Sequence, residues 1–343
     1  MTATSTTSTD GPVDLKQFYS GKRVVLTGGL GFIGSNLAHR LVDLDARVVL
    51  IDNYLPDHGA NPANIRDITD KLEVQRADVR SAEDMDRLLP GADLVFHLAA
   101  QADHGASLQQ PSLDFRINVL GTATVLQCLK RNSPATRLVY CGTRSEYGSP
   151  ETIPVTESTP LLPLDIYSAD KLAGSFLALN GHRLGGLPVI CLRPSNLYGP
   201  RAQMRHPGYG ILNWFIRLAI DNEPITVYGD GLQLRDYTFV VDAADAFCRA
   251  GASQSAVGKV FNLGHAKPLA LVDLAKKIVA VAGSGRLEFV PWPKGSKRMD
   301  VGDYATDSTR LKQLTGWEPV TSIDQGLQNT VEYYRKYRRD YWD

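Results

Sequence analysis

The sequence lacks the features that mark several large classes of protein. Its 37 basic and 37 acidic side chains give a net charge of zero, and no basic block suggests a nucleic-acid or membrane-surface partner. No apolar run approaches the ~20 residues that a membrane-spanning helix needs. The four cysteines lie singly in apolar stretches, without a Cys-x-x-Cys spacing, at Cys128, Cys141, Cys191 and Cys248. We therefore expect buried free thiols rather than disulfides, no metal site, and a cytoplasmic location.

A secretory signal is also absent from the first residues. The segment MTATSTTSTDGP is polar and rich in Thr and Ser, without the basic start and apolar centre of a signal peptide. Such a composition provides too little apolar surface to order a chain. We expect residues 1–20 to form a disordered tail.

Short β-branched runs alternate with helical patterns through most of the chain. The helical patterns include 32–44, 115–131 and 166–184. Continuously apolar strands that alternate with helices indicate a parallel sheet covered on both faces, a doubly wound α/β fold. The predicted strands are 23–28, 47–52, 72–79, 93–100, 137–143 and 188–194.

The rhythm becomes less regular after Pro194. Loops rich in Gly, Arg and Tyr alternate with helices expected near 212–221, 271–282 and 322–338. We expect a smaller C-terminal α/β lobe that covers the carboxyl edge of the sheet, where open α/β sheets bind ligands. The predicted division is a sheet domain of residues 21–194 plus about 236–264, and a substrate-binding lobe of 195–235 and 265–338.

The segment LTGGLGFIGSNL contains the glycine spacing of a dinucleotide-binding loop. Gly28, Gly31 and Gly34 follow the first predicted strand and open a helix, so the chain can turn sharply and leave bare backbone for a pyrophosphate. The helix N-terminus then offers N–H groups to the phosphates. Asp52 ends the next strand, where a carboxylate accepts hydrogen bonds from a ribose and repels a 2′-phosphate. These features predict a Rossmann-type fold that binds NAD rather than NADP.

A second motif is the pair Tyr167 and Lys171. The two residues are four apart and therefore share one face of a helix that follows the strand ending at Thr143. The spacing alone arises easily by chance, and a solvated helix face is the alternative. A neighbouring ammonium lowers the pKa of a phenol, which could then take a proton from a sugar hydroxyl.

Together these motifs resemble one family. They follow one another along the chain in the same order as in the nucleotide-sugar branch of the extended short-chain dehydrogenases/reductases. The chain therefore resembles the NAD-dependent epimerases/dehydratases. The similarity runs from about Lys22 to about Tyr334. It is carried by the glycine loop, Asp52, HLAAQ (97–101), INVLGT (117–122), Thr143 with Tyr147-Gly148, Tyr167/Lys171, RPSNLYGPR (193–201), YGDGLQLRDY (228–237), FNLG (261–264) and the Gly316-Trp317 and Pro319 positions.

The resemblance implies a role for individual residues. Tyr167 is the base, Lys171 its partner and a ligand of the nicotinamide ribose, and Thr143 the hydrogen-bonding partner of the reacting hydroxyl. The implied NAD-binding residues are Gly28, Gly31, Phe32, Ile33, Gly34, Asp52, Asn53, Asp78, Val79, Leu98, Ala99, Ala100, Gln101, Asn118, Tyr167 and Lys171. The implied substrate-binding residues are Thr143, Asn196, Tyr228, Arg235 and Arg298.

Some of these assignments keep alternatives. The spacing from Arg298 to Asp307 is one residue shorter than in common family members. The alternative to a substrate contact is therefore that Arg298 is a solvated surface arginine. His104, Arg205 and His206 lie in loops that face the pocket in the family and are possible substrate contacts only.

The residues after Thr143 bear on the reaction. In the family, 4,6-dehydratases carry Asp-Glu there, and decarboxylases usually carry Glu at the second place, whereas this chain has Arg144 and Ser145. Glu146 comes next, but on an extended segment a one-residue shift turns a side chain to the other face. Epimerisation at C4 needs no further acid or base, so we expect an NAD-dependent nucleotide-sugar 4-epimerase. Arg144 either pairs with a substrate carboxylate, as in a uronic acid, or faces solvent.

Other readings stay open at this point. They are a 2-epimerase, a 4,6-dehydratase, a decarboxylase, a 4-ketoreductase and a non-catalytic NAD-binding regulator. The resemblance also implies a homodimer through the helices 115–131 and 166–184, with an apolar face that includes Ala123, Leu126, Leu172, Phe176 and Leu179. A monomer core would use the same residues.

Overall fold

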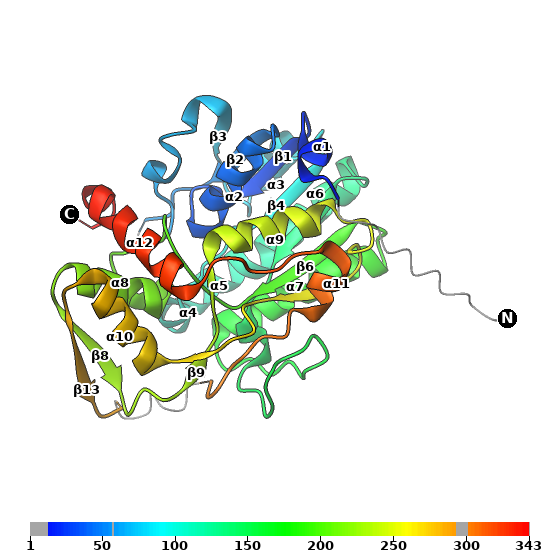
Figure 1. Ribbon diagram of the computed structural model, residues 1–343. Coiled ribbons are helices and arrows are strands. Elements are labelled where there is room, and N and C mark those ends of the chain that lie inside the picture. Colours follow the sequence, from blue (N-terminus) through cyan, green and yellow to red (C-terminus); the bar gives the residue numbers. More distant parts are fainter. Residues whose placement is uncertain (1–12, 57, 293–300, 343) are drawn as a thin grey trace.

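Seven short strands form one sheet at the centre of the molecule (Figure 1). The computed structural model describes residues 13–56, 58–292 and 301–342. Every hydrogen-bonded strand pair in this sheet is parallel. In spatial order the strands are β11 (Val260–Leu263), β6 (Val189–Pro194), β5 (Arg137–Cys141), β4 (Leu94–His97), β1 (Arg23–Thr27), β2 (Arg47–Asp52) and β3 (Leu72–Arg76). The strand order reverses between β1 and β4, which is the place where doubly wound sheets bind ligands.

Apolar residues on both faces explain why these strands are buried. Successive side chains of a strand point to opposite faces. On β1, Val24 and Leu26 belong to the core on one side of the sheet, and Val25 belongs to the core on the other side. All three side chains are fully buried. The predicted doubly wound parallel sheet is confirmed.

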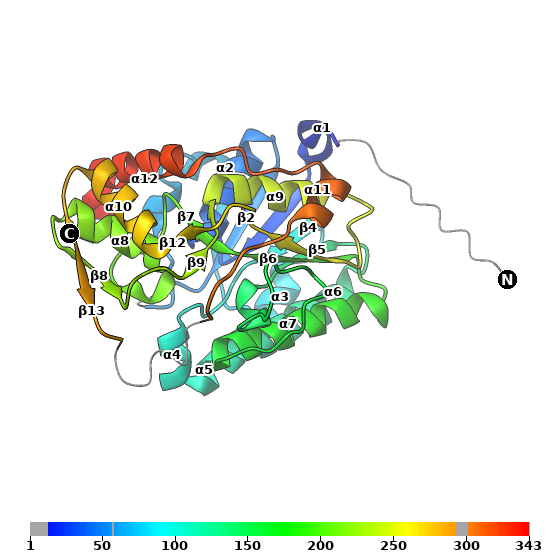
Figure 2. The same ribbon diagram turned by 60° about the horizontal axis from the view of Figure 1, so that its bottom comes forward.

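Helices cover both faces (Figure 2). The first group shares a core with Val24 and Leu26 and consists of α1 (Leu15–Tyr19), α2 (Phe32–Asp43), α9 (Val240–Ala252) and α11 (Thr309–Thr315). The second group packs on the side of Val25 and consists of α3 (Ala82–Leu88), α6 (Thr122–Asn132) and α7 (Ile166–Arg183). Two short helices and a π-helical turn lead into α6, namely α4 (His104–Gln109), α5 (Pro111–Phe115) and η3 (Arg116–Gly121).

A smaller lobe with its own core lies beside the sheet. Its core joins Phe215, Leu274 and Leu327 from three helices. These are α8 (Ile211–Ile220), α10 (Leu271–Ala282) and α12 (Ile323–Tyr337). Its strand pairs are parallel β8 (Pro224–Tyr228) with β13 (Arg286–Val290), parallel β7 (Asn196–Tyr198) with β10 (Tyr237–Phe239), and antiparallel β9 (Leu234–Arg235) with β12 (Leu269–Ala270). The remaining 3₁₀ turns are η1 (Pro62–Ile65), η2 (Thr69–Lys71), η4 (Arg144–Tyr147), η5 (Pro207–Tyr209) and η7 (Arg338–Asp340).

The predicted tail boundary at residue 20 is wrong. Leu15–Tyr19 form α1, in which the Asp14 side chain accepts a hydrogen bond from the Gln17 N–H at the N-cap. The Tyr19 ring is fully buried, and its hydroxyl donates to the Cys248 carbonyl at 2.8 Å. The buried ring of Tyr19 anchors this segment to the core. The polar composition of the first residues gave no sign of this anchor. Residues 1–12 lie outside the described part.

Two further expectations concern the cysteines and the membrane. All four cysteines are free and buried, as predicted. Within the described ranges, no helix combines the length and the apolarity that crossing a membrane requires.

Candidate active site

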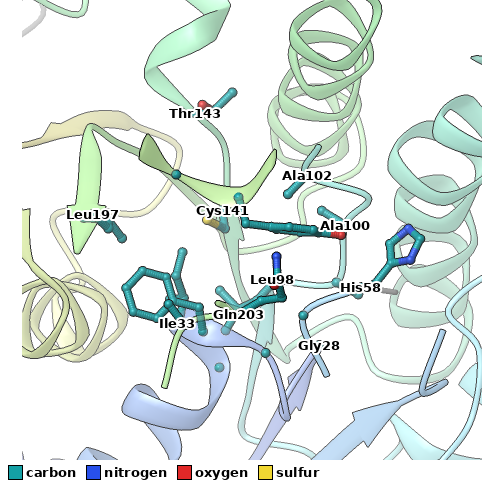
Figure 3. Close-up of a pocket in the computed structure, with 18 of the residues that line it drawn as sticks. Gly28, Ile33, His58, Leu98, Ala100, Ala102, Cys141, Thr143, Leu197 and Gln203 are labelled. Atoms are coloured by element: carbon teal, nitrogen blue, oxygen red, sulfur yellow. The ribbon is translucent and has the colours of Figure 1, made fainter. Parts of the chain in front are cut away.

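A cavity of about 490 Å³ lies over the carboxyl ends of the sheet strands. Its wall includes the loops after β1, β2, β3, β4, β5 and β6, and the lobe residues 202–203 and 207–212. In the close-up, Gly28 and Ile33 lie at the lower end of the view and Thr143 at the upper end, with Leu98 and Cys141 between them (Figure 3). The cavity therefore joins the predicted cofactor loop to the predicted catalytic residues.

The glycine loop leaves backbone exposed to the cavity. Gly28 has a positive φ of 69°, and a Cβ at this position would lie 2.8 Å from the Ala99 nitrogen. A Cβ on Gly34 would lie 2.2 Å from the Gly28 carbonyl oxygen. Side chains at these two positions are therefore excluded, and Gly28, Gly31, Phe32, Ile33 and Gly34 all line the cavity. A loop of this kind ahead of α2 fits a pyrophosphate, since it offers free N–H groups at a helix N-terminus.

Asp52 connects this loop to the end of β2. Its carboxylate accepts hydrogen bonds from the Leu30 N–H at 3.2 Å and the Tyr54 N–H at 3.0 Å. Burial raises the pKa of Asp52, although the backbone donors oppose the shift. A carboxylate oxygen has room for further donors, so the site fits the ribose hydroxyls of NAD.

Asp78 and Val79, two of the expected NAD-binding residues, line the cavity together with Asn53. The Asn53 amide donates to Asp78 at 3.1 Å, and Arg80 binds the same carboxylate at 2.5 and 2.9 Å. Burial alone would raise the pKa of Asp78, but the hydrogen bonds from Arg80 outweigh it and lower the pKa to about 2. The carboxylate is thus charged and fixed in place at neutral pH.

The wall segment 98–100 is held by a buried hydrogen-bonded chain. His97 lies between two hydroxyls, with its Nδ1 2.7 Å from Thr27 Oγ1 and its Nε2 3.1 Å from Thr122 Oγ1. Thr27 Oγ1 also accepts from the N–H groups of Leu98 and Ala99 at 3.2 Å. Burial, together with the charge of Lys171, lowers the pKa of His97 to about 3, so the ring is neutral.

Gln101 and Asn118 lie behind this wall rather than on it. Both side chains are buried, and neither lines the cavity. Asn118 exchanges two hydrogen bonds with the backbone of Gln101, at 3.1 and 3.0 Å, and donates to Asp114 at 3.0 Å. This geometry does not favour the direct contact with NAD that was expected of Gln101 and Asn118. Instead, the two residues position the segment that forms the wall. The other expected cofactor residues line the cavity.

Thr143, Tyr167 and Lys171 meet at one end of the cavity. Asp165 caps α7 by accepting from the Ser168 N–H at 2.8 Å, and this helix carries Tyr167 and Lys171 on one face. Thr143 follows the end of β5 by two residues and caps η4, where its hydroxyl accepts from the Ser145 N–H at 3.2 Å. The spacing of these residues in the sequence therefore becomes a shared site.

The electrostatics of this group follow from burial. Burial raises the pKa of Tyr167, and a hydrogen bond with Thr143 opposes the rise without cancelling it. Burial lowers the pKa of Lys171, whose Nζ lies 4.6 Å from the centre of the Tyr140 ring. A positive charge near the phenol favours its ionised form, and Lys171 is the buried cation available on the same helix face.

Glu146 is removed from the cavity by a buried ion pair. Its Oε2 accepts from Arg193 Nε at 2.7 Å, and its Oε1 accepts from the Thr143 N–H at 3.0 Å and from Ser175 Oγ at 2.8 Å. Arg144 and Ser145 line the cavity instead. The expectation that Glu146 faces away agrees with this arrangement, but the segment is a 3₁₀ turn and not extended.

The expected substrate residues are distributed unevenly. Asn196 lines the cavity, whereas Tyr228 and Arg235 do not. Tyr228 is 40% exposed and packs on Trp292 with a ring separation of 5.4 Å. Arg235 donates to the carbonyls of Leu234, at 2.8 Å, and Gly302. Arg298 lies outside the described residues.

Sequence reasoning missed one pair beside Tyr167. His104, taken only as a possible contact, lines the cavity, with its Nδ1 2.5 Å from Asp165 and its ring 4.7 Å from that of Tyr167. Burial alone would raise the pKa of Asp165, but His104 lowers it to about 2. No local pattern joins residues 61 positions apart, although a His and an Asp that both flank helix starts are a weak signal.

Comparison with known proteins agrees with this site. Residues 24–264 match the model of the NAD dependent epimerase/dehydratase family. The chain is 33% identical to a UDP-glucose 4-epimerase of Mycolicibacterium smegmatis, over 91% of this chain and 98% of that one. It is 34% identical to a dTDP-glucose 4,6-dehydratase of Streptomyces griseus, over 93% and 96%.

A solved structure identifies the cofactor of a relative with the same fold. DesIV, a dTDP-glucose 4,6-dehydratase from Streptomyces venezuelae with NAD bound, superposes with a TM-score of 0.84 at 28% identity, covering 94% of this chain and 99% of that one. The glycine loop and Asp52 described above fit the same cofactor, which is NAD. This chain belongs to the NAD-dependent epimerase/dehydratase family.

Proposed function

We propose that this enzyme inverts the C4 centre of a nucleotide-linked sugar through a transient 4-keto sugar. The relatives act on nucleotide sugars, but they include both an epimerase and a dehydratase at similar identity. The observation that carries the choice is the set of groups at the reaction end of the cavity. Thr143, Tyr167 and Lys171 are there, and the Asp and Glu side chains that line the described cavity are Asp52 and Asp78, near the glycine loop.

The roles of the three residues follow from their chemistry. Bound NAD supplies the hydride acceptor and donor. Tyr167 takes the proton of the sugar 4-hydroxyl and later returns one to the same oxygen. Thr143 offers a hydroxyl that hydrogen-bonds the reacting oxygen, and Lys171 favours the phenolate of Tyr167 by its charge. Once the keto sugar has presented its other face, no further acid or base is required.

Water elimination and decarboxylation find less support. Elimination requires a proton donor and acceptor next to Thr143, and neither Arg144 nor Ser145 exchanges protons readily near neutral pH. Glu146 is the nearest carboxylate in sequence, but it is paired with Arg193 and fully buried. Moving it into the cavity would leave the Arg193 charge buried and unpaired, which costs several kcal/mol.

The test is to incubate the enzyme with NAD and a panel of UDP-, dTDP-, CDP-, GDP- and ADP-sugars and to follow the products by NMR. We expect one nucleotide sugar to be converted into its C4 epimer, with no net change in the absorbance of reduced nicotinamide. The Tyr167→Phe variant is the matched negative control. A dehydrated, decarboxylated or C2-inverted product without a C4 epimer would overturn the proposal, and stoichiometric reduction of the added NAD with accumulation of a 4-keto sugar, the reverse of ketoreduction, would identify a 4-ketoreductase.

A further inference from the structure

Arg144 is an unusual side chain for the wall of this cavity. It directly follows Thr143 and is only partly exposed. Its Nε donates to Asn196 Oδ1 at 3.1 Å, and its guanidinium carbon lies 5.1 Å from the centre of the Tyr304 ring. These two contacts from the lobe fix the direction of the side chain. The guanidinium is therefore held in place and not extended into bulk solvent.

This cation forms no ion pair within the described ranges. No Asp or Glu oxygen of the described residues lies within 4.0 Å of a guanidinium nitrogen of Arg144, the limit for an ion pair. Its Nη1 is buried and has no hydrogen-bond partner among the described residues. Arg193, the neighbouring buried arginine, shows the usual arrangement, since it pairs with Glu146 at 2.7 Å. A desolvated guanidinium without such a partner is unfavourable, and an anionic oxygen relieves the cost.

A second positive charge makes the imbalance larger. Burial lowers the pKa of Arg144, and the charge of Arg235 lowers it further. The nearby carboxylate of Asp236 interacts with Arg144 only at longer range. Arg235 does not itself line the cavity, but its charge adds to the positive potential around Arg144, which favours a ligand with negative charge there.

The place of Arg144 indicates which part of the substrate it meets. Consecutive Cα atoms are about 3.8 Å apart, so Arg144 and Thr143 serve neighbouring parts of one bound molecule. Thr143 belongs with Tyr167 and hence with C4 of the sugar. In a hexopyranose the substituent next to C4 on the ring-oxygen side is C6, carried by C5. A planar guanidinium binds a carboxylate through two parallel hydrogen bonds.

We infer that Arg144 binds a carboxylate at C6 of the sugar, so that the substrates are nucleotide-linked uronic acids. The inference rests on the proposed C4 epimerisation and specifies its substrate class. The β-phosphate of the nucleotide offers anionic oxygens of the same chemistry. If Arg144 bound that phosphate, it would contribute equally to the binding of neutral and of acidic nucleotide sugars. A preference for acidic sugars therefore distinguishes the carboxylate from the phosphate as the group that Arg144 binds.

The experiment compares matched glucuronate and glucose derivatives of UDP, dTDP, CDP, GDP and ADP. Binding to the NAD-loaded enzyme is measured by calorimetry, and kcat/KM is measured for each pair that turns over. We expect the uronate of at least one pair to be preferred by tenfold or more. Arg144→Gln should lose about 10- to 100-fold on the uronate, with little change on the neutral sugar and on the free nucleoside diphosphate.

Arg144→Lys separates charge from shape, because it keeps the cation but not the planar fork. It should retain part of the preference for the uronate. Equal or better use of glucose by the wild type, failure of every uronate to bind, or a loss in Arg144→Gln that is the same for both sugars would overturn the inference. If uronates bind preferentially through Arg144 but no C4 epimer forms, the proposed reaction fails while the assignment of Arg144 stands.

Discussion

Tyr167 is the residue on which the proposed chemistry depends most directly. Its phenol is buried, its pKa is raised by that burial, and its neighbours in the cavity wall are Thr143 and Lys171. A buried phenol is a weak base until positive charge is placed beside it. Activity should therefore depend on the bound cofactor and on Lys171 more than on any group in the lobe.

Replacing Tyr167 by Phe should remove the proton acceptor and leave the cavity shape intact. We expect kcat to fall by about 10²- to 10⁴-fold, the usual contribution of general base catalysis. The variant should still bind NAD through the glycine loop and Asp52, and its unfolding temperature should change little, which calorimetry and thermal denaturation can check. Retention of more than a tenth of the wild-type kcat would contradict the assignment of Tyr167 as the base.

His97 predicts how stability depends on pH. The ring is neutral in the folded protein, with a pKa lowered to about 3, while an unfolded histidine has a pKa near 6.5. Between these values the unfolded state binds more protons, so the free energy of unfolding falls as pH falls from about 6.5. The contribution of His97 is up to ~1.4 kcal/mol for each pH unit.

The measurement is urea denaturation at pH 7 and pH 5 for the wild type and for His97→Asn. The variant should be less stable at pH 7, because the hydrogen bonds to Thr27 and Thr122 are weakened. Its stability should fall less than that of the wild type between the two pH values. An equal fall in both proteins would show that His97 is not buried in its neutral form.

Individual site residues were predictable where local pattern and chemistry coincide. The glycines, Asp52 and the Tyr167/Lys171 pair are marked by short spacing and by their place after strands, and the structure puts all of them on the cavity wall. The sequence could not show whether Gln101 and Asn118 lie on the wall or behind it. Their position depends on two hydrogen bonds between the Asn118 side chain and the backbone of Gln101, which belong to different segments of the chain. The His104–Asp165 contact likewise depends on tertiary packing.

The turn η4 is the element that decides what faces the substrate. Its first residues enter the cavity wall, while Glu146 points into the protein and joins η4 to β6 through Arg193 and to α7 through Ser175. Tyr147 extends the network, because its hydroxyl accepts from Arg193 at 2.9 Å and donates to Asn262 at 2.7 Å. The ion pair therefore holds the turn that carries Thr143.

Glu146→Ala should destabilise the protein by about 3–5 kcal/mol, because it leaves the charge of Arg193 buried and unpaired. Glu146→Gln keeps an oxygen that can accept from the Thr143 N–H and Ser175 Oγ, but its amide NH2 cannot accept from Arg193 Nε, so it should cost less than Glu146→Ala without being neutral. A double variant with Arg193→Met should recover part of the stability lost in Glu146→Ala. Chemical denaturation measures all of these variants. A Glu146→Gln protein of wild-type stability that has lost activity would instead identify Glu146 as a catalytic acid.

Hydrophobic pattern predicted six of the seven strands of the sheet, without β11, but it did not predict all of their ends. β3 and β4 stop three residues before the predicted limits, at Arg76 and His97, and the residues that follow leave the sheet to line the cavity. Helix α9 was not predicted as a helix; its exposed stripe is narrow, with Asp245 and Arg249 four residues apart, and most of its other side chains are buried. β8 and β13 pair across about sixty residues, which no local signal encodes.

Across the whole molecule, exposed apolar side chains gather on one helical layer. Phe115 and Leu120 lie just ahead of α6, and Phe176 and Leu177 lie on α7, all between 37% and 49% exposed. This agrees in part with the predicted dimer face, although Leu126 is buried in the monomer core. Large apolar groups on neighbouring helices favour a partner surface of the same kind.

We predict a homodimer formed by this layer. Phe176→Glu should shift the mass in light scattering toward the monomer at micromolar concentration. Phe289→Glu, which changes a 54% exposed ring on β13 in the lobe, is the matched control and should leave the dimer intact. A wild-type protein of monomeric mass at that concentration would refute the prediction.

The central claim concerns the whole catalytic cycle, namely that the hydride taken from C4 returns to C4. The most direct measurement uses the nucleotide sugar identified in the panel, deuterated at C4, with products examined by NMR and mass spectrometry. We predict an unchanged mass, inverted configuration at C4 and deuterium retained at that carbon. Loss of water with deuterium at C6, or loss of deuterium from the sugar with accumulation of reduced nicotinamide, would contradict it.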